Sequence, residues 1–279
     1  NKNVQTNQNN ALFDLSGDLT VPFQKAVSSL SYEICKYFVD QKLYINYEVL
    51  AGYAKSFGNI SVEIFVLIYE QWNIKIKKGF ATDLLIPSIK SKNIKLTEHL
   101  LKLGIPYGNC FYEAVGTGDI NLVSLIYKFN SNLSFINQVS SNGTPLMSAV
   151  RNNDIPMINY LITMKGIDPN ITDMNNNSVL SLVQNRFDIM KILLQLDNIN
   201  LNIVLNGGST PLTNAISNKN LEISKMLIEH PKTNINFKNS NNQSPLLVAV
   251  INGFVEVVEL LVNNEKFDPI ESSLNYAFY

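Results

Sequence analysis

The sequence has very little cysteine and very little histidine. Only Cys35 and Cys110 stand among 279 residues, so a disulfide-linked scaffold is excluded and a reducing compartment is expected. The two histidines, His99 and His230, form no Cys/His cluster of the kind that holds zinc. We therefore expect no metal, no cofactor and no catalytic residues, and the chain is not expected to be an enzyme.

Net charge and long apolar runs are also lacking. A formal net charge of −1 gives no general attraction to nucleic acid or to an anionic membrane surface. The run from Ile60 to Tyr69 is interrupted by Glu63 and is too short to span a bilayer. Residues 1–18 form a polar tail without the apolar centre of a secretory signal. We expect a cytoplasmic protein, with the nucleus as an alternative.

What the sequence does have is ample apolar content, 46% of the residues, and an internal repeat. Four short segments begin at residues 144, 178, 210 and 244, at intervals of 34, 32 and 34. Each is followed by two short apolar patterns of helical period. The segments are Thr144-Pro145-Leu146, Ser178-Val179-Leu180, Thr210-Pro211-Leu212 and Ser244-Pro245-Leu246.

Weaker copies precede these four. They start near residues 21, 49, 83 and 109, and a partial ninth copy starts at about residue 272. The predicted organisation is a polar tail over 1–18 and a single repeat array over 19–279. In the second helix of each copy, one column is apolar throughout. It contains Ile34, Val62, Leu96, Leu122, Met157, Ile189, Ile223 and Val257.

Residues that favour a helix start precede the second helices. The predicted N-caps are Ser31, Asn59, Asn93, Asp119, Asp154 and Asn220, whereas Phe254 breaks the column.

The Thr-Pro-Leu-x-x-Ala pattern followed by a Leu-Leu helix resembles the ankyrin repeat. The resemblance implies an all-α ankyrin-repeat solenoid of about eight helix-turn-helix repeats. Hairpin-like finger loops are expected between repeats, longer in the C-terminal half. The asparagine content and the shortened N-terminal copies resemble those of large asparagine-rich ankyrin proteins of protists. The fourth-position histidine of the family is absent, so we expect a less rigid array that unfolds in steps, with residues 49–82 weakest.

Three asparagines in the segment Met174-Asn175-Asn176-Asn177-Ser178 fall at a predicted fingertip. One column of the fingers is expected to need a positive φ, which glycine and asparagine tolerate best. The residues in that column are Asn142, Asn176, Gly208 and Asn242.

The resemblance further implies a protein-binding surface on the finger tips and first helices. In the fingers, the implied exposed residues are Ser140, Ser141, Gly143, Met174, Asn175, Asn177, Asn206, Gly207, Ser209, Ser240, Asn241 and Gln243. In the first helices they are Arg151, Asn152, Ser217, Asn218, Ile251 and Asn252.

Three interpretations of the function stay open at this point. The first is a non-catalytic protein–protein interaction module with an unidentified protein partner. The second is the substrate-recruiting region of a larger enzyme or ubiquitin-ligase adaptor. The third is a self-associating scaffold. We expect a monomer, with weak self-association through the uncapped C-terminal end as the alternative.

A run of lysines extends from Lys75 to Lys102. It is either an ordinary solvated surface or a basic patch for an acidic partner. Reversing Lys90, Lys92 and Lys95 to glutamate distinguishes the two, because unchanged binding would reject a basic patch.

Overall fold

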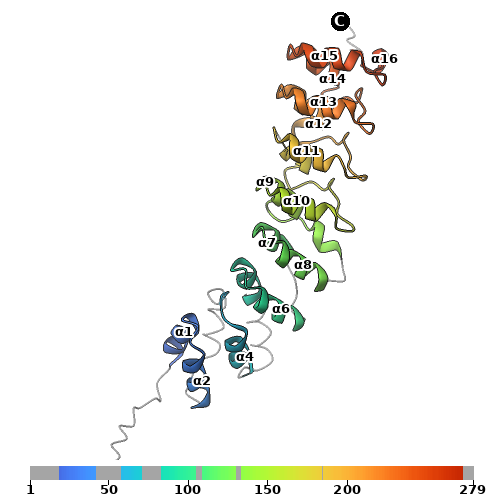
Figure 1. The fold of residues 1–279 in the computed structure, drawn as a ribbon. Helices are drawn as coiled ribbons and strands as arrows, with labels where there is room; N and C mark the ends of the chain where they lie inside the picture. The colour runs from blue at the N-terminus through green and yellow to red at the C-terminus, as the bar shows by residue number, and fades with distance from the viewer. Residues whose placement is uncertain are drawn as a thin grey trace, which may run out of the picture. The chain divides into compact units, whose positions relative to one another are not determined.

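The structure, a computed structural model, describes residues 19–41, 58–70, 83–104, 109–129, 133–183 and 185–272. These residues form short helices arranged in antiparallel pairs (Figure 1). The described part of the chain contains no extended strand, only an isolated bridge between Ser140 and Gly143. The predicted all-α, helix-turn-helix class is confirmed.

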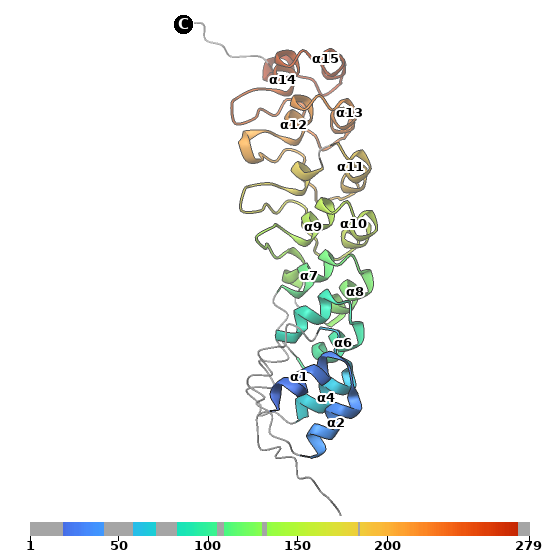
Figure 2. The same cartoon turned by 90° about the vertical axis from the view of Figure 1, so that its left-hand side faces the viewer.

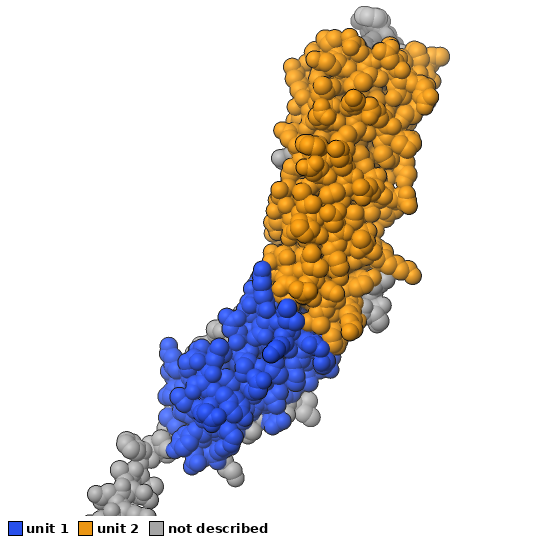
Figure 3. Space-filling model, viewed as in Figure 1, with its two compact units in different colours: residues 1–110 blue, residues 111–279 orange. Residues whose placement is uncertain are grey.

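The chain divides into two compact units, residues 1–110 and residues 111–279 (Figure 3). In the first unit, α1 packs on α2, α2 on α4, and α4 on α6. Its described residues form α1 (Thr20–Ser28), α2 (Tyr32–Asp40), α4 (Val62–Glu70), a helix over residues 83–90, and α6 (Ile94–Lys102). Much of the predicted copy near residue 49 lies outside the described residues. That residues 19–279 form a single solenoid remains a prediction.

The second unit is a stack of helix pairs with long connections between the pairs. Figure 2 shows the first helices of the pairs in one layer, the second helices in another, and the connections beside the first helices. The first-helix positions hold α7 (Cys110–Gly116, its first residue in the other unit), α9 (Pro145–Arg151), the 3-10 helix η3 (Val179–Leu182), α12 (Pro211–Ser217) and α14 (Pro245–Ile251). The second-helix positions hold α8 (Ile120–Phe129), α10 (Ile155–Ile162), α11 (Phe187–Leu193), α13 (Leu221–Glu229) and α15 (Val255–Val262). The connections include η2 (Leu133–Asn137) and η4 (Asn206–Gly208), and α16 (Pro269–Ser272) follows α15.

The first helices begin where the repeat pattern predicts. Thr144, Thr210 and Ser244 each have extended backbone, and each side chain accepts a hydrogen bond from the backbone N–H three residues later. A proline follows each of them, where its missing N–H costs nothing. At Ser178 the proline is replaced by Val179, the side chain makes no such bond, and only a 3-10 helix forms.

The caps of the second helices are confirmed at four of the predicted positions. Asn93, Asp154 and Asn220 accept from the N–H three residues on, and Asp119 accepts from the N–H of Asn121 and Leu122. Of the other two predictions, Ser31 is at the N-cap position of α2 but without the expected bond, and Asn59 is wrong. The Ser31 side chain makes no cap bond. At α4 the Ser61 hydroxyl accepts from Ile64 N–H at 3.2 Å in place of Asn59.

The apolar column of the second helices forms the core of the second unit. Leu122, Met157, Ile189, Ile223 and Val257 are fully or almost fully buried, and each side chain of this kind contributes about 1.5–3 kcal/mol. The column fails at the start of the chain.

In α4 the predicted Val62 is only partly buried and Ile64 is buried instead, and α2 shows a similar shift. Ile34 is 50% exposed and Cys35 is buried instead, while the ring of Phe38 lies 5.6 Å from that of Phe23. At this level of α2 the buried residue is therefore Cys35, one position after the predicted Ile34, while Phe38 contacts α1.

Adjacent repeats of the second unit are joined by a line of asparagine side chains, which we call the asparagine ladder. Each ladder residue bridges two backbone groups of the next repeat, one through each end of its amide. The ladder residues are Asn137, Asn170, Asn202 and Asn236. Their Oδ1 atoms accept from the N–H of Asp168 (2.9 Å), Asn200 (2.7 Å), Asn234 (2.8 Å) and Asp268 (3.1 Å). Their Nδ2 atoms donate to the carbonyls of Gly166 (2.7 Å), Asn198 (2.7 Å), Lys232 (3.0 Å) and Lys266 (2.8 Å).

Candidate functional site

Two finger loops of the second unit are closed by a side chain at their base. In the finger over residues 173–177, Asp173 N–H donates to the Asn177 carbonyl at 2.9 Å. The Asp173 carboxylate accepts from the N–H of Asn175 and of Asn177, both at 2.9 Å. The finger over residues 239–243 repeats this pattern, with Asn239 in place of Asp173. One carboxylate or amide oxygen therefore fixes the shape of each loop.

The positive-φ column of the fingers is confirmed at three positions. Asn176 and Asn242 both have φ 58°, and Gly208 has φ 79°. The prediction for Asn142 is wrong, because the left-handed residue of the first finger is the next one, Gly143, with φ 90°.

The first finger closes differently, and Val139 occupies the place of Asp173 and Asn239. A valine side chain offers no oxygen to the backbone, and the loop closes instead through two bonds between Ser140 and Gly143, at 2.9 and 3.0 Å. Gly143 is buried, and a Cβ there would meet Met147 and Arg151 side-chain atoms. Its prediction as an exposed partner contact is therefore corrected.

Neighbouring finger tips are bonded to each other. Asn206 N–H donates to the Asn176 carbonyl at 3.2 Å, and Ser240 N–H donates to the Gly208 carbonyl at 2.8 Å. Between the first two fingers the link is Arg151. Its guanidinium donates to the Asn142 carbonyl and, at 3.0 Å, to the Asp173 carboxylate. The four tips thus form one continuous row.

Asp173 is the buried charge in this row, with a side chain only 5% exposed. Burial by itself raises the pKa of this carboxyl. The hydrogen bonds from Asn177 and Asn175 and the charge of Arg151 outweigh that effect, so the pKa of Asp173 is lowered overall. The carboxylate is ionised at neutral pH and holds both the finger and Arg151.

Most of the predicted contact residues are on the surface. Met174 is 80% and Ile251 61% exposed. The other exposed members of the predicted set are Ser141, Arg151, Asn152, Asn175, Asn206, Gly207, Ser217, Asn218, Ser240 and Asn241. Ser140, Asn177, Ser209, Gln243 and Asn252 are partly buried.

Several predicted contacts already have partners within the chain. The Asn177 side chain donates to Asp173, the Gln243 side chain accepts from Asn239, and the Asn252 side chain donates to the Val248 carbonyl. The amides of Asn175, Asn206 and Asn241 at the tips are the better candidates for contact. Apart from Arg151, the predicted set carries no charge.

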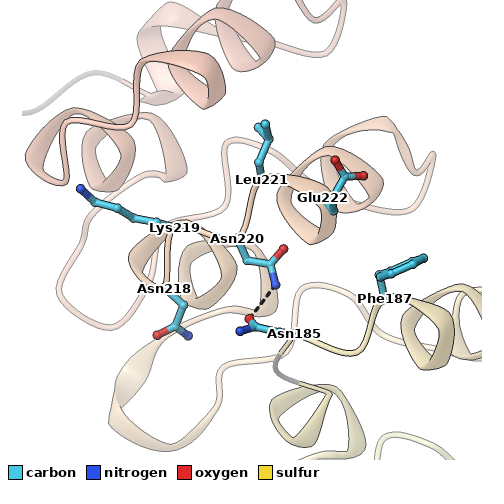
Figure 4. A pocket seen from close by; sticks show the side chains of 7 residues that line it. All are labelled: Asn185, Phe187, Asn218, Lys219, Asn220, Leu221 and Glu222. Carbon is cyan, nitrogen blue, oxygen red and sulfur yellow. Dashed lines mark hydrogen bonds between the residues drawn. The ribbon is translucent and has the colours of Figure 1, made fainter.

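A hollow of about 290 Å³ lies at the helix–helix turns of two successive repeats (Figure 4). Asn220 and Asn185 are joined across it by a 2.8 Å bond between side chains. Phe187 and Leu221, 44% and 36% exposed, give it an apolar side. Of the predicted residues, Asn218 lines it. The other lining residues were not predicted. The sequence does carry a signal for them, because successive second helices begin with an apolar residue, Phe187 and Leu221.

The basic residues of the first unit face solvent. Lys90, Lys92 and Lys95 are exposed, and Lys102 forms an ion pair with Glu98 at 2.7 Å. Lys75, Lys77 and Lys78 lie outside the described residues.

The remaining side chains of a reactive type, one cysteine and the two histidines, take part in packing and local hydrogen bonding. Burial raises the pKa of Cys35 to about 11, which leaves a poor nucleophile. His99 packs edge-on against Phe65, 5.6 Å between ring centres. The pKa of His230 is lowered, mainly by burial and further by Lys232 and Lys266, against a hydrogen bond with Leu194.

Two features are absent from the part of the chain that the structure describes. Its residues bring together no group of three His, Cys, Asp or Glu side chains fit for a metal ion. None of its helices has the length and apolar character needed to cross a membrane.

Stacked helix pairs joined by bonded fingers define the class of helical repeat proteins. A family model described as "Ankyrin repeats (3 copies)" matches residues 82–173 and 178–271. The chain therefore belongs to the ankyrin repeat family.

The fold also resembles the crystal structure of EF0377, an ankyrin repeat protein. The TM-score is 0.53 and the sequence identity 16%, over 65% of this chain and 97% of that chain. At that identity the likeness concerns the fold alone. No curated protein sequence matches the chain.

Proposed function

We propose that this chain is a non-catalytic protein–protein interaction module. Its partner would be a protein that contacts the finger tips and the exposed side of the first helices in the second unit. Ankyrin repeats are generally modules of this kind, and the matched repeats cover residues 82–173 and 178–271.

The observation that carries the proposal is the row of bonded tips. Backbone bonds from Asn206 to Asn176 and from Ser240 to Gly208 hold the fingers in fixed register. The tips therefore present exposed side chains at little further cost in conformational entropy when a partner binds.

The chemistry of the row indicates how the partner is held. Its exposed side chains are mainly amides and hydroxyls, with Met174 and Ile251 as apolar contacts. Because aromatic and arginine anchors are scarce, we expect modest affinity, weakly dependent on salt. We place the protein in the cytoplasm or nucleus and, from its asparagine content, among the protist-type members of the family.

Site-specific photo-crosslinking tests the proposal. A photoreactive residue at Asn175 or Asn241 should capture one and the same protein in cells. The matched control positions are Lys225 and Glu259, which are exposed on the second helices and should not capture it. Capture from the control positions alone would place the binding surface elsewhere.

The affinity of the captured protein provides the second test. Asn175→Arg and Asn241→Arg leave the backbone bonds of the fingers intact and should weaken binding by about tenfold or more, as at the centre of an interface. If neither variant changes the affinity and Lys225→Glu does, the proposal is wrong. The substrate-recruiting alternative is favoured if the captured protein is ubiquitinated only when the tips are intact.

A further inference from the structure

Asparagine is followed directly by glycine at three places, Asn142-Gly143, Asn206-Gly207 and Asn252-Gly253. Glycine has no side chain to shield its backbone nitrogen, so that nitrogen can approach the side-chain carbonyl carbon of the preceding asparagine. All three pairs lie in the second unit, two at finger tips and one at a helix–helix turn.

The chemistry available to such a pair is deamidation. The glycine nitrogen forms a bond to Cγ of the asparagine and loses its proton, while the Cγ–Nδ2 bond breaks and ammonia leaves. Water then opens the cyclic imide at either carbonyl. The products are aspartate, or isoaspartate in which the main chain runs through the side chain. The net reaction consumes one water and releases one ammonia, and it needs no enzyme.

Two of the three pairs are protected by hydrogen bonds. Gly143 is buried and its N–H donates to the Ser140 carbonyl at 3.0 Å. Gly253 N–H donates to the Val250 carbonyl at 3.0 Å, and the Asn252 side chain donates to the Val248 carbonyl at 2.8 Å. In both pairs the attacking nitrogen must first lose its acceptor, and in the second pair the leaving amide must as well.

The pair at Asn206 differs on each of these points. Asn206 and Gly207 are both exposed, and Gly207 already has a positive φ of 77°. Among the described residues, neither the Gly207 N–H nor the Asn206 side-chain amide has a hydrogen-bond partner. The finger around this pair is closed by bonds from Leu205 N–H to the Ser209 carbonyl (2.8 Å) and from Gly208 N–H to the Leu205 carbonyl (3.0 Å), and Asn206 N–H donates to the Asn176 carbonyl (3.2 Å). None of these bonds involves the attacking nitrogen or the leaving amide. We propose that Asn206 is a site of spontaneous deamidation in the folded protein, modified well before Asn142 and Asn252.

The modification would alter the surface assigned to the partner, and this consequence rests on the proposed function. It adds a carboxylate to a row whose exposed tip residues, Met174, Asn175, Ser240 and Asn241, carry no charge. Isoaspartate also lengthens the main chain beside Gly208, whose carbonyl accepts the 2.8 Å bond from Ser240 N–H. The register of the last two fingers would then be disturbed.

The test is peptide mapping of the full chain after incubation at body temperature and mildly alkaline pH. Fragmentation mass spectrometry locates the mass gained when an amide becomes an acid. We expect modification at Asn206 to be faster than at Asn142 and Asn252 by roughly tenfold or more, the factor for breaking about one extra hydrogen bond. Asn206→Gln should abolish the signal in that loop, because glutamine would need a larger ring.

The same chain in denaturant is the control. Without the fold, the three pairs should react at similar rates. Equal rates in the folded chain, or faster modification of Asn142 or Asn252, would overturn the proposal. These rates are measured without a partner, so they can refute the deamidation proposal without bearing on the proposed function. That second question is decided by comparing partner affinity for the native chain and for Asn206→Asp.

Discussion

At the scale of single residues, Asp173 makes more bonds within the candidate surface than any single predicted contact residue does. Its carboxylate accepts from two backbone amides of its own finger and pairs with Arg151, which also holds the first finger. At Asn239 an amide oxygen closes the last finger in the same way, without an ion pair.

Asp173→Ala should lower the free energy of unfolding by about 1–2 kcal/mol, because two backbone amides and Arg151 lose their acceptor. Asp173→Asn should cost much less, since an amide oxygen closes the equivalent finger at Asn239. Urea denaturation of the two variants provides the comparison. An alanine variant as stable as the asparagine variant would show that the carboxylate does not organise the finger.

The lowered pKa of Asp173 makes its contribution depend on pH. The fold favours the ionised form, so the contribution is complete above the usual aspartate pKa of about 3.9 and is lost as the pH falls below that value. Stability measured from neutral pH down into this range should fall less steeply in Asp173→Asn than in the native chain. Parallel curves would contradict the assignment.

At this scale the sequence predicts the capping role of side chains better than the conformation of the backbone. Asn93, Asp154 and Asn220 cap their helices as expected, because a cap needs only its own next turn. The positive φ falls on Gly143 and not on Asn142, in a finger that closes through backbone bonds between Ser140 and Gly143. Ser31 makes no cap bond, and no periodicity shows whether one hydroxyl will do so.

At the scale of elements, the asparagine ladder bonds each described repeat of the second unit to the next. The absence of the family's fourth-position histidine predicts a looser array, yet each described joint from Asn137 to Asn236 has two side-chain bonds. The second asparagine of Asn200-Leu201-Asn202 and Asn234-Ile235-Asn236 is visible in the sequence. Its acceptor is not, because that acceptor lies in the next repeat.

Asn202→Ala should lower the free energy of unfolding by about 1–2 kcal/mol through the loss of two bonds. Asn202→Asp is the informative contrast. Its carboxylate can still accept from Asn234 N–H, but it cannot donate to the Lys232 carbonyl and would repel that oxygen. We expect the aspartate variant to be no more stable than the alanine variant in chemical denaturation. Full stability in Asn202→Asp would mean that the donated bond contributes nothing.

Among the four first helices that begin after residues 144, 178, 210 and 244, only η3 lacks both the proline and the cap bond, and it should respond to proline. Ser178 has φ −92° and ψ 171°, a backbone that suits a residue before proline. Val179→Pro should raise the melting temperature, equivalent to about 0.5–1 kcal/mol. Ser181→Pro is the contrast, since its N–H donates to the Ser178 carbonyl at 3.1 Å, and it should destabilise. Destabilisation by Val179→Pro as well would show that valine is required there.

At the scale of the whole molecule, unfolding should occur in steps and not as one event. Each helix pair packs on its neighbours and has no core of its own, and the chain divides at residue 110 into two units. Native-state hydrogen exchange should give higher protection in α10 and α13 than in α1 and α2. One common opening free energy for all helices would contradict this expectation. The predicted weak region, residues 49–82, lies largely outside the described residues.

The sequence predicts the second unit well and the first poorly, for one physical reason. From residue 109 onward the copies keep intervals of 32 to 35, so each apolar column aligns with the next. Before that the connections shorten, and Ile34, assigned to the core by alignment, is 50% exposed. The location of the finger tips in the chain could be predicted. The bonds between them could not, since they join residues about 30 positions apart.

The asparagine ladder also gives every described joint between repeats the same pattern of hydrogen bonds. Every joint uses the same two backbone groups, whichever residues carry them. Removal of residues 171–202 would bring Asn170 to the place of Asn202, facing the Lys232 carbonyl and the Asn234 N–H with the same side chain. A gene segment one repeat long could be lost or copied while the ladder bonds at the new junction are kept. An array of this kind can change its length, and so the span of partner it reaches, in single genetic steps.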